Sequence, residues 1–196
     1  MDTAGEQDLR TRPDEQQPSG RVVAVHRDAQ HAFSKHPEPS IVLVEGLGVE
    51  GDAHAGTTVR HRSRVARDPT APNLRQVHLI ASELFDDLAL AGHLVRPGHL
   101  GENVTTSGLD LRALPLGTLL DIGEAQVRLT GLRNPCYQID RFQDGLREAV
   151  TTRDSTGKPS LRSGVMSVVT RSGSVRAGDP IVVVLPPPPH VALARV

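Results

Sequence analysis

Cysteine is almost absent from this sequence, in which Cys136 is the only one among 196 residues. A single cysteine excludes an internal disulfide, and nothing in the composition points to an oxidising compartment. No apolar run approaches the roughly 18 residues that a membrane-spanning helix needs, and residues 1–20 lack the apolar stretch of a secretory signal. We therefore expect a cytoplasmic protein with no role at a membrane.

Aromatic residues and lysine are also scarce. The aromatic set is one Tyr and three Phe, without Trp, which is too few for the base-stacking platforms of many nucleic-acid-binding proteins. The net charge of -1 gives no general attraction to nucleic acid either. Lys35 and Lys158 are the only lysines, and both fall in polar, proline-flanked stretches. Neither is therefore expected to be the desolvated lysine that a Schiff-base enzyme needs.

The length of the chain suits a single domain. Residues 1–20 are polar and contain proline, which is typical of a disordered leader. The predicted domain covers residues 21–185. Four prolines at 186–189 then begin a segment that we expect to be an extended, solvated tail over 186–196.

Short apolar segments separated by glycine-containing turns dominate the predicted domain. The segments typical of strands are 21–26, 41–44, 76–80, 118–122, 125–130, 164–170 and 180–185. One helix is clearly indicated, over 83–91, with Ser82 as its N-cap and Gly92 as its stop. Strict alternation of strands and helices is missing, which argues against a doubly wound sheet. The pattern predicts a mainly β protein, a closed β-barrel with a few short peripheral helices.

The candidate reactive residue is Cys136, within the segment 131–140. Asn134 is a good N-cap and Pro135 suits the first position of a helix, so Cys136 is expected at the second. Backbone N–H groups and the helix dipole would lower the thiol pKa there, and Arg133 adds a positive charge. A thiolate is both a nucleophile and a soft metal ligand. The alternative, a small buried apolar side chain, stays open.

Two other segments contain motifs that predict a binding site less strongly. Residues 46–51 match GxGxxG, but no helical period follows, so a dinucleotide site is not expected. Residues 60–67 contain four arginines, among them Arg60, Arg62 and Arg64. Such a run is either a solvated loop or a clamp for phosphate or carboxylate.

Four motifs in order resemble those of the MOSC domain family, the small stand-alone relatives of the C-terminal domain of molybdenum cofactor sulfurase. The resemblance runs from about residue 21 to residue 185. The motifs are Gly51-Asp52-Ala53-His54-Ala55-Gly56, Gly101-Glu102-Asn103-Val104-Thr105, Leu116-Gly117-Thr118 and Gly131-Leu132-Arg133-Asn134-Pro135-Cys136. Many members of the family have His-Gly-Gly in the first motif, where this chain has His54-Ala55-Gly56.

The resemblance implies a MOSC-like barrel that works with molybdenum cofactor. It implies either a carrier of sulfur or of the cofactor, or a molybdenum-dependent reductase of N-hydroxylated compounds. Cys136 would be the molybdenum ligand or the sulfur carrier, and Arg133 would stabilise its anionic sulfur. The cofactor-binding residues expected from the resemblance and the arginine run are Asp52, His54, Arg60, Arg62, Arg64, Glu102 and Asn103.

The expected partners follow from what the sequence lacks. No flavin, haem or iron–sulfur motif is present, so a reductase would need a separate electron-transfer protein, and a carrier would need a sulfur donor. The substrate would be a small molecule, and the oligomeric state is left open. Pyridoxal phosphate is not expected, because the chain has no desulfurase domain and no suitable lysine. The alternatives are a non-catalytic cofactor carrier and a single-cysteine thiol redox protein.

Overall fold

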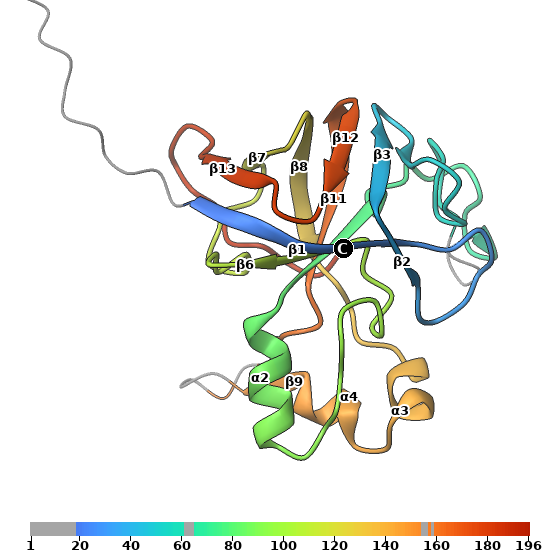
Figure 1. Cartoon of the computed structure of the whole chain (residues 1–196), viewed down its shortest axis with the longest axis vertical. Helices are drawn as coiled ribbons and strands as arrows, with labels where there is room; N and C mark the ends of the chain where they lie inside the picture. Colours follow the sequence, from blue (N-terminus) through green and yellow to red (C-terminus); the bar gives the residue numbers. More distant parts are fainter. Residues whose placement is uncertain (1–18, 61–64, 154–156, 158) are drawn as a thin grey trace, which may run out of the picture.

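A computed structural model describes residues 19–60, 65–153, 157 and 159–196 (Figure 1). The expected leader falls almost entirely outside these residues, since only Ser19 and Gly20 are described. No helix in the described part of the chain is long and apolar enough to cross a membrane.

A closed β-barrel is the centre of the fold, as the sequence predicts. Each of its strands pairs with the next around the barrel, and β13 closes the ring by pairing with β1. The pairing of β5 with β6 is parallel, and the other pairs around the ring are antiparallel. In order around the ring, the strands are β13 (Pro180–Val184), β7 (Leu119–Ile122), β8 (Ala125–Leu132), β11 (Val165–Arg171), β5 (Val77–Ala81), β6 (Val104–Ser107) and β1 (Ser19–Arg27).

Short elements surround the barrel. Strand β2 (His36–Glu38) pairs with the end of β1 in antiparallel orientation. Strand β3 (Ser40–Val44) pairs with β12 (Gly173–Arg176) on one side and with β4 (Gly48–Val49) on the other. Strand β9 (Thr151–Arg153) pairs with β10 (Pro159–Leu161). Three helices lie together below the barrel in the view of Figure 1. They are α2 (Glu83–Leu90), α3 (Gln138–Phe142) and α4 (Leu146–Ala149).

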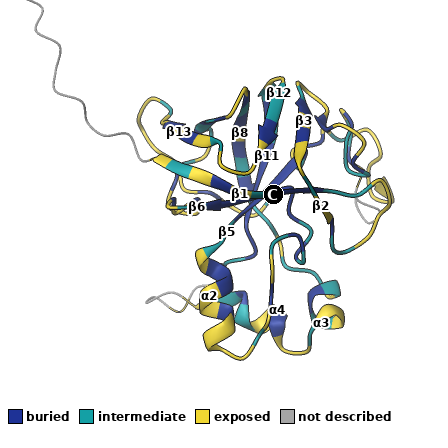
Figure 2. Ribbon diagram, viewed as in Figure 1, coloured by how far each residue is buried: buried dark blue, intermediate teal, exposed yellow. Residues whose placement is uncertain are grey.

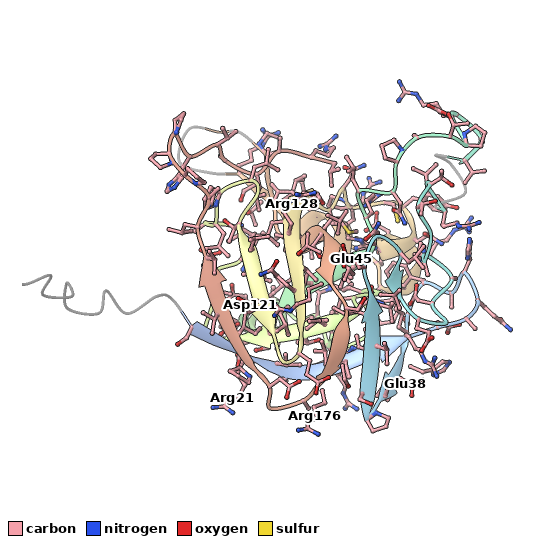
Figure 3. All side chains as sticks on the ribbon, turned by 90° about the horizontal axis from the view of Figure 1, so that it is seen from above. Arg21, Glu38, Glu45, Asp121, Arg128 and Arg176 are labelled. Atoms are coloured by element: carbon pink, nitrogen blue, oxygen red, sulfur yellow. The ribbon has the colours of Figure 1, made fainter. Side chains whose placement is uncertain are left out.

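Alternating side chains explain why these segments form a barrel. Along β8, Ala125, Val127 and Leu129 are buried, whereas Arg128 between them is exposed and points outward (Figure 3). A second apolar cluster, which includes Leu100 and the fully buried Ile139, joins the barrel to the helices. Figure 2 shows both buried regions. Each fully buried aliphatic side chain contributes about 1.5–3 kcal/mol to folding.

The C-terminal segment is extended but does not leave the domain as a solvated tail. The Leu132 N–H donates to the Ala194 carbonyl (2.8 Å), and the Val196 N–H donates to the Leu132 carbonyl (3.2 Å). Leu193 is buried in the core of the barrel. A Cβ at Gly131 would lie 2.6 Å from the Ala194 oxygen, so this close approach requires glycine. Strand β13 ends at Val184, just before the four prolines, and the chain then continues to the end of β8, where Arg195 forms a parallel bridge with Leu132.

Replacing Leu193 with alanine is therefore expected to lower the free energy of unfolding by about 2–4 kcal/mol, because the change leaves a cavity in the core. Val191 lies two residues away and is 57% exposed, so Val191→Ala is expected to change this energy by less than about 0.5 kcal/mol. Urea unfolding of both variants measures the difference. Equal stabilities would show that the segment does not pack against the barrel in solution.

Candidate functional site

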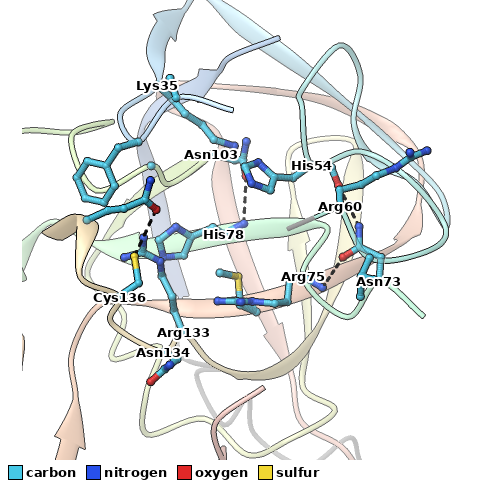
Figure 4. A pocket seen from close by; sticks show the side chains of 16 residues that line it. Lys35, His54, Arg60, Asn73, Arg75, His78, Asn103, Arg133, Asn134 and Cys136 are labelled. Carbon is cyan, nitrogen blue, oxygen red and sulfur yellow. Dashed lines mark hydrogen bonds between the residues drawn. The ribbon is translucent and has the colours of Figure 1, made fainter. Parts of the chain in front are cut away.

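A pocket of about 270 Å³ brings together residues that are far apart in the sequence. They come from the segment before β2, the loop after β4, strand β5, the turn before β6 and the segment after β8 (Figure 4). The polar and titratable side chains on which the argument below depends are Lys35, His54, His78, Asn103, Arg133 and Cys136.

Cys136 lies in the pocket wall, but not on a helix as predicted. Helix α3 begins at Gln138, with Tyr137 at the N-cap position, so Cys136 precedes it. Strand β8 ends at Leu132, the Arg133 N–H donates to the Gly164 carbonyl (2.9 Å), and residues 133–136 belong to no helix or strand. The argument from the helix dipole is therefore wrong. Cys136 is half-buried, and its Sγ lies 3.5 Å from Oε1 of Gln138.

Arg133 supplies an unsatisfied donor next to this cysteine. Its Nη1 atom is buried and has no hydrogen-bond partner among the described residues. Burial lowers the pKa of Arg133, and the nearby Cys136 and Glu102 oppose this shift. A guanidinium stays protonated in proteins, and a buried donor without a partner costs free energy. Arg133 is therefore placed to bind an anion in the pocket.

Lys35 corrects the expectation that neither lysine is desolvated. It is buried, and its Nζ lies 2.5 Å from Oδ2 of Asp52. Burial lowers the pKa of Lys35, and Asp52 opposes this shift. For Asp52, burial alone would raise the pKa, but hydrogen bonds from His54 and the charge of Lys35 hold it well below its usual range. The pair is thus an ammonium and a carboxylate.

Asn103 and Glu102 have different positions although they are neighbours. Asn103 lines the pocket, and its Nδ2 donates to Oδ2 of Asp52 (3.0 Å). Glu102 is fully buried behind the wall, where its Oε1 accepts from the Gly98 N–H (2.6 Å) and from the Thr105 hydroxyl (3.1 Å). Burial raises the pKa of Glu102. Glu102 therefore supports the wall and is not one of the residues that line the pocket.

His54 and His78 are the imidazoles of the pocket. The Nδ1 of His54 lies 3.2 Å from Oδ1 of Asp52. His78, on β5, is buried, and its Nε2 lies 2.8 Å from the Ser163 carbonyl. Burial, reinforced by the charge of Arg133, holds the pKa of His78 well below its usual range. His78 is therefore neutral at pH 7.

The arginine run is only partly described. Arg60 lines the pocket and is exposed, with its Nε donating to the Ala55 carbonyl (3.2 Å). Arg62 and Arg64 lie outside the described residues. Arg75 also lines the pocket, although it is not part of the run.

Sequence reasoning missed Lys35, His78 and Arg75. A signal existed for His78 alone, since it is a polar residue within the apolar segment 76–80.

Comparisons with known proteins agree with this architecture. The family model of the MOSC domain matches residues 51–182, which is more than half of the chain. The chain belongs to the MOSC domain family. No curated protein matches the sequence significantly.

Solved structures are similar over most of this MOSC chain. YuaD from Bacillus subtilis has a TM-score of 0.69 and 26% identity, covering 84% of this chain and 95% of YuaD. YiiM from Geobacillus stearothermophilus has a TM-score of 0.62 and 19% identity, covering 88% and 79%. YiiM from Escherichia coli has a TM-score of 0.58 and 22% identity, covering 89% and 72%. At these identities, the two YiiM structures show the fold alone.

The pocket residues fit a metal that is already coordinated by an organic cofactor. Within the described ranges, no three His, Cys, Asp or Glu side chains are grouped to hold a bare metal ion. One soft thiol, that of Cys136, suits a thiophilic metal already bound by a cofactor. The unpartnered Nη1 of Arg133 and the exposed guanidinium of Arg60 suit an anionic group of the same cofactor. Molybdenum cofactor, an anionic pterin dithiolene, has this combination.

Proposed function

We propose that this MOSC protein binds molybdenum cofactor in the pocket around Cys136 and reduces N-hydroxylated small molecules there. One observation carries the proposal: Cys136 and Arg133 line the same pocket, and the buried Nη1 of Arg133 has no hydrogen-bond partner among the described residues. The thiol is a soft ligand for the metal, and the guanidinium neutralises anionic charge beside it. Membership of the family supports this assignment.

Each pocket residue has a defined part in this proposal. Cys136 ligates the metal or carries sulfur to it. Arg133 and Arg60 place positive charge around the anionic pterin, and Asn103 fixes the position of the buried Lys35–Asp52 ion pair through its hydrogen bond to Asp52. When bound, the cofactor supplies a redox-active metal that can accept oxygen from a substrate. The electrons come from a separate electron-transfer protein of the cytoplasm.

Replacing Cys136 with serine is expected to remove the metal. Protein made in a host that synthesises molybdenum cofactor should hold close to one molybdenum and one pterin per chain, and Cys136→Ser should hold less than about a tenth of that, because a neutral hydroxyl is a poor ligand for a thiophilic metal. Metal analysis and pterin fluorescence measure both quantities. Tyr137→Phe is the matched control, since Tyr137 is adjacent, 59% exposed and not part of the pocket wall.

The outcomes separate the possible roles. Absence of both molybdenum and pterin from the parent protein would overturn the proposal. Metal retained in Cys136→Ser would show that other residues hold the cofactor and would leave Cys136 as a sulfur carrier. If the parent protein holds the cofactor but does not reduce N-hydroxylated compounds when a reduced viologen supplies electrons, the protein is a carrier that stores or delivers the cofactor.

A further inference from the structure

Asp52 and His54 form a dyad at the pocket, and its geometry resembles that of a proton-transfer pair. Oδ1 of Asp52 accepts the backbone N–H of His54 (2.9 Å) and lies 3.2 Å from its Nδ1. Oδ2 accepts from Nζ of Lys35 and from Nδ2 of Asn103. The Asp52 side chain is 2% exposed and that of His54 is 30% exposed. The carboxylate is therefore fixed in place while the imidazole reaches the pocket.

This arrangement determines the tautomer of His54. An ionised carboxylate only accepts hydrogen bonds, so the ring nitrogen that faces it must carry the hydrogen. That nitrogen is Nδ1, which leaves Nε2 as the atom that gains or loses a proton. Nε2 makes no hydrogen bond to any other residue in the described part of the chain.

The surroundings hold the ring in this orientation. The His31 ring stacks on it, with centroids 5.2 Å apart and planes 12° apart. The Asn73 side chain donates to the carbonyl of His54 (2.9 Å) and to that of Gly56 (3.0 Å), which fixes the loop. Figure 4 draws His54 and Cys136 at opposite sides of the pocket. A substrate between them would meet the metal site on one side and Nε2 on the other.

The other titratable groups considered near the pocket either have partners of their own or do not line the pocket. Nζ of Lys35 is buried in its ion pair with Asp52. Nε2 of His78 faces the Ser163 carbonyl, and burial keeps this ring neutral. Glu102 does not line the pocket. Among the described imidazoles of the pocket, His54 therefore has an Nδ1 that is hydrogen-bonded to Asp52 and an Nε2 that bonds to no described residue.

We infer that His54 is the general acid of the proposed reduction and that Asp52 positions it. The inference rests on the proposed function and adds a catalytic residue to it. In the reaction R–NH–OH + 2 H⁺ + 2 e⁻ → R–NH₂ + H₂O, the N–O bond breaks, an N–H bond forms and the oxygen leaves as water. The reduced electron-transfer protein supplies both electrons. His54 Nε2–H gives one proton to the departing oxygen, solvent gives the other, and solvent then reprotonates the partly exposed ring.

The test compares His54→Gln with the parent, both loaded with cofactor. We expect kcat to fall by about 100-fold, because a general acid contributes about that much or more, while the molybdenum content and KM stay within about twofold. In His54→Ala, added imidazole should restore at least about a tenth of the parental kcat. His36→Gln is the matched control. His36 is also near an aspartate, with Nε2 3.6 Å from Oδ2 of Asp28, but its side chain is 84% exposed outside the pocket.

A second measurement does not depend on the cofactor. Nitrogen-15 NMR of the protein without cofactor should show His54 with its hydrogen on Nδ1 when the ring is neutral, and Asp52→Asn should weaken this preference. Loss of molybdenum from His54→Gln would make His54 a cofactor ligand and overturn the inference. Parental kcat in that variant, or a hydrogen on Nε2, would overturn it as well. A parent without molybdenum would overturn the proposed function and this role together.

Discussion

Replacing Asp52 with alanine is expected to lower the free energy of unfolding by about 3–5 kcal/mol, because the change leaves the Lys35 ammonium buried without its counter-charge. The side chains of Lys35 and Asp52 are 4% and 2% exposed, so water cannot replace the lost partner. The substitution also removes the acceptor of the Asn103 side chain and of the His54 backbone N–H. Urea unfolding at pH 7 measures the effect.

An exposed ion pair is the control for this prediction. Nη2 of Arg171 lies 2.8 Å from Oδ1 of Asp121, with side chains that are 53% and 31% exposed. Because solvent screens such a pair, Asp121→Ala is expected to cost less than about 1 kcal/mol. The double variant Lys35→Met with Asp52→Leu should recover part of the loss, because it buries no charge. If Asp52→Ala cost no more than Asp121→Ala, the buried pair would not contribute to stability.

The same pair explains how the pocket is assembled. Asp52 accepts hydrogen bonds from four residues, which are His54 in its own loop, Lys35 and the backbone N–H of Asp28 (3.3 Å) between β1 and β2, and Asn103 before β6. Each of these contacts fixes one part of the wall relative to the others. Variants of Asp52 are therefore expected to affect cofactor binding and stability together, whereas variants of His54 should affect turnover alone.

The barrel was predictable because its signal is local. Alternating side chains identify strands such as β8, and glycine marks the turns between them. The closure of the ring between β1 and β13 joins segments from opposite ends of the chain, and no local pattern specifies that pairing. Strand β12 is not among the predicted strands, because Gly173 is depleted in strands and the segment is short. Its hydrogen bonds to β3 and the buried Val175 outweigh that preference.

The site was predictable where the residue type itself carries the chemistry. Cys136, Arg133, Asn103 and His54 all line the pocket. Lys35 was missed because its neighbours in sequence are polar, and its burial depends on Asp52, which is distant along the chain. Composition describes the neighbours in sequence, whereas desolvation depends on the neighbours in space. The start of α3 was predicted too early for a similar reason, since the Arg133 N–H bonds to the carbonyl of Gly164, which is also distant along the chain.

Acidification is expected to unfold this protein in a pH range set by a buried histidine. His26, on β1, is 1% exposed, and its Nδ1 has no partner within the described residues. Burial, reinforced by the positive charges of Lys35 and His99, lowers its pKa from 6.5 to about 4. The folded protein therefore holds His26 neutral at a pH where the unfolded chain already binds a proton.

The direction of the effect follows from that difference. Above pH 6.5 both states are neutral at His26, and the full stability is present. As the pH falls from 6.5 to about 4, the unfolded state gains a proton that the folded state does not bind, so the free energy of unfolding falls by about 3 kcal/mol. His78, whose pKa is also lowered by burial, adds to the loss in the same direction.

Urea unfolding of the parent and of His26→Asn between pH 4 and pH 8 separates the contribution of His26 from that of His78. Asparagine does not titrate, so the variant should be less dependent on pH by about 3 kcal/mol over this range, even if it is less stable at pH 8. The matched control is His190→Asn, because His190 is exposed and its Nε2 lies 2.9 Å from the Pro186 carbonyl. Parallel pH profiles for the parent and His26→Asn would show that His26 titrates normally in the folded protein. A pH profile of the unfolding free energy that is flatter for His26→Asn, but not for His190→Asn, would show that the buried environment of His26 causes the acid sensitivity.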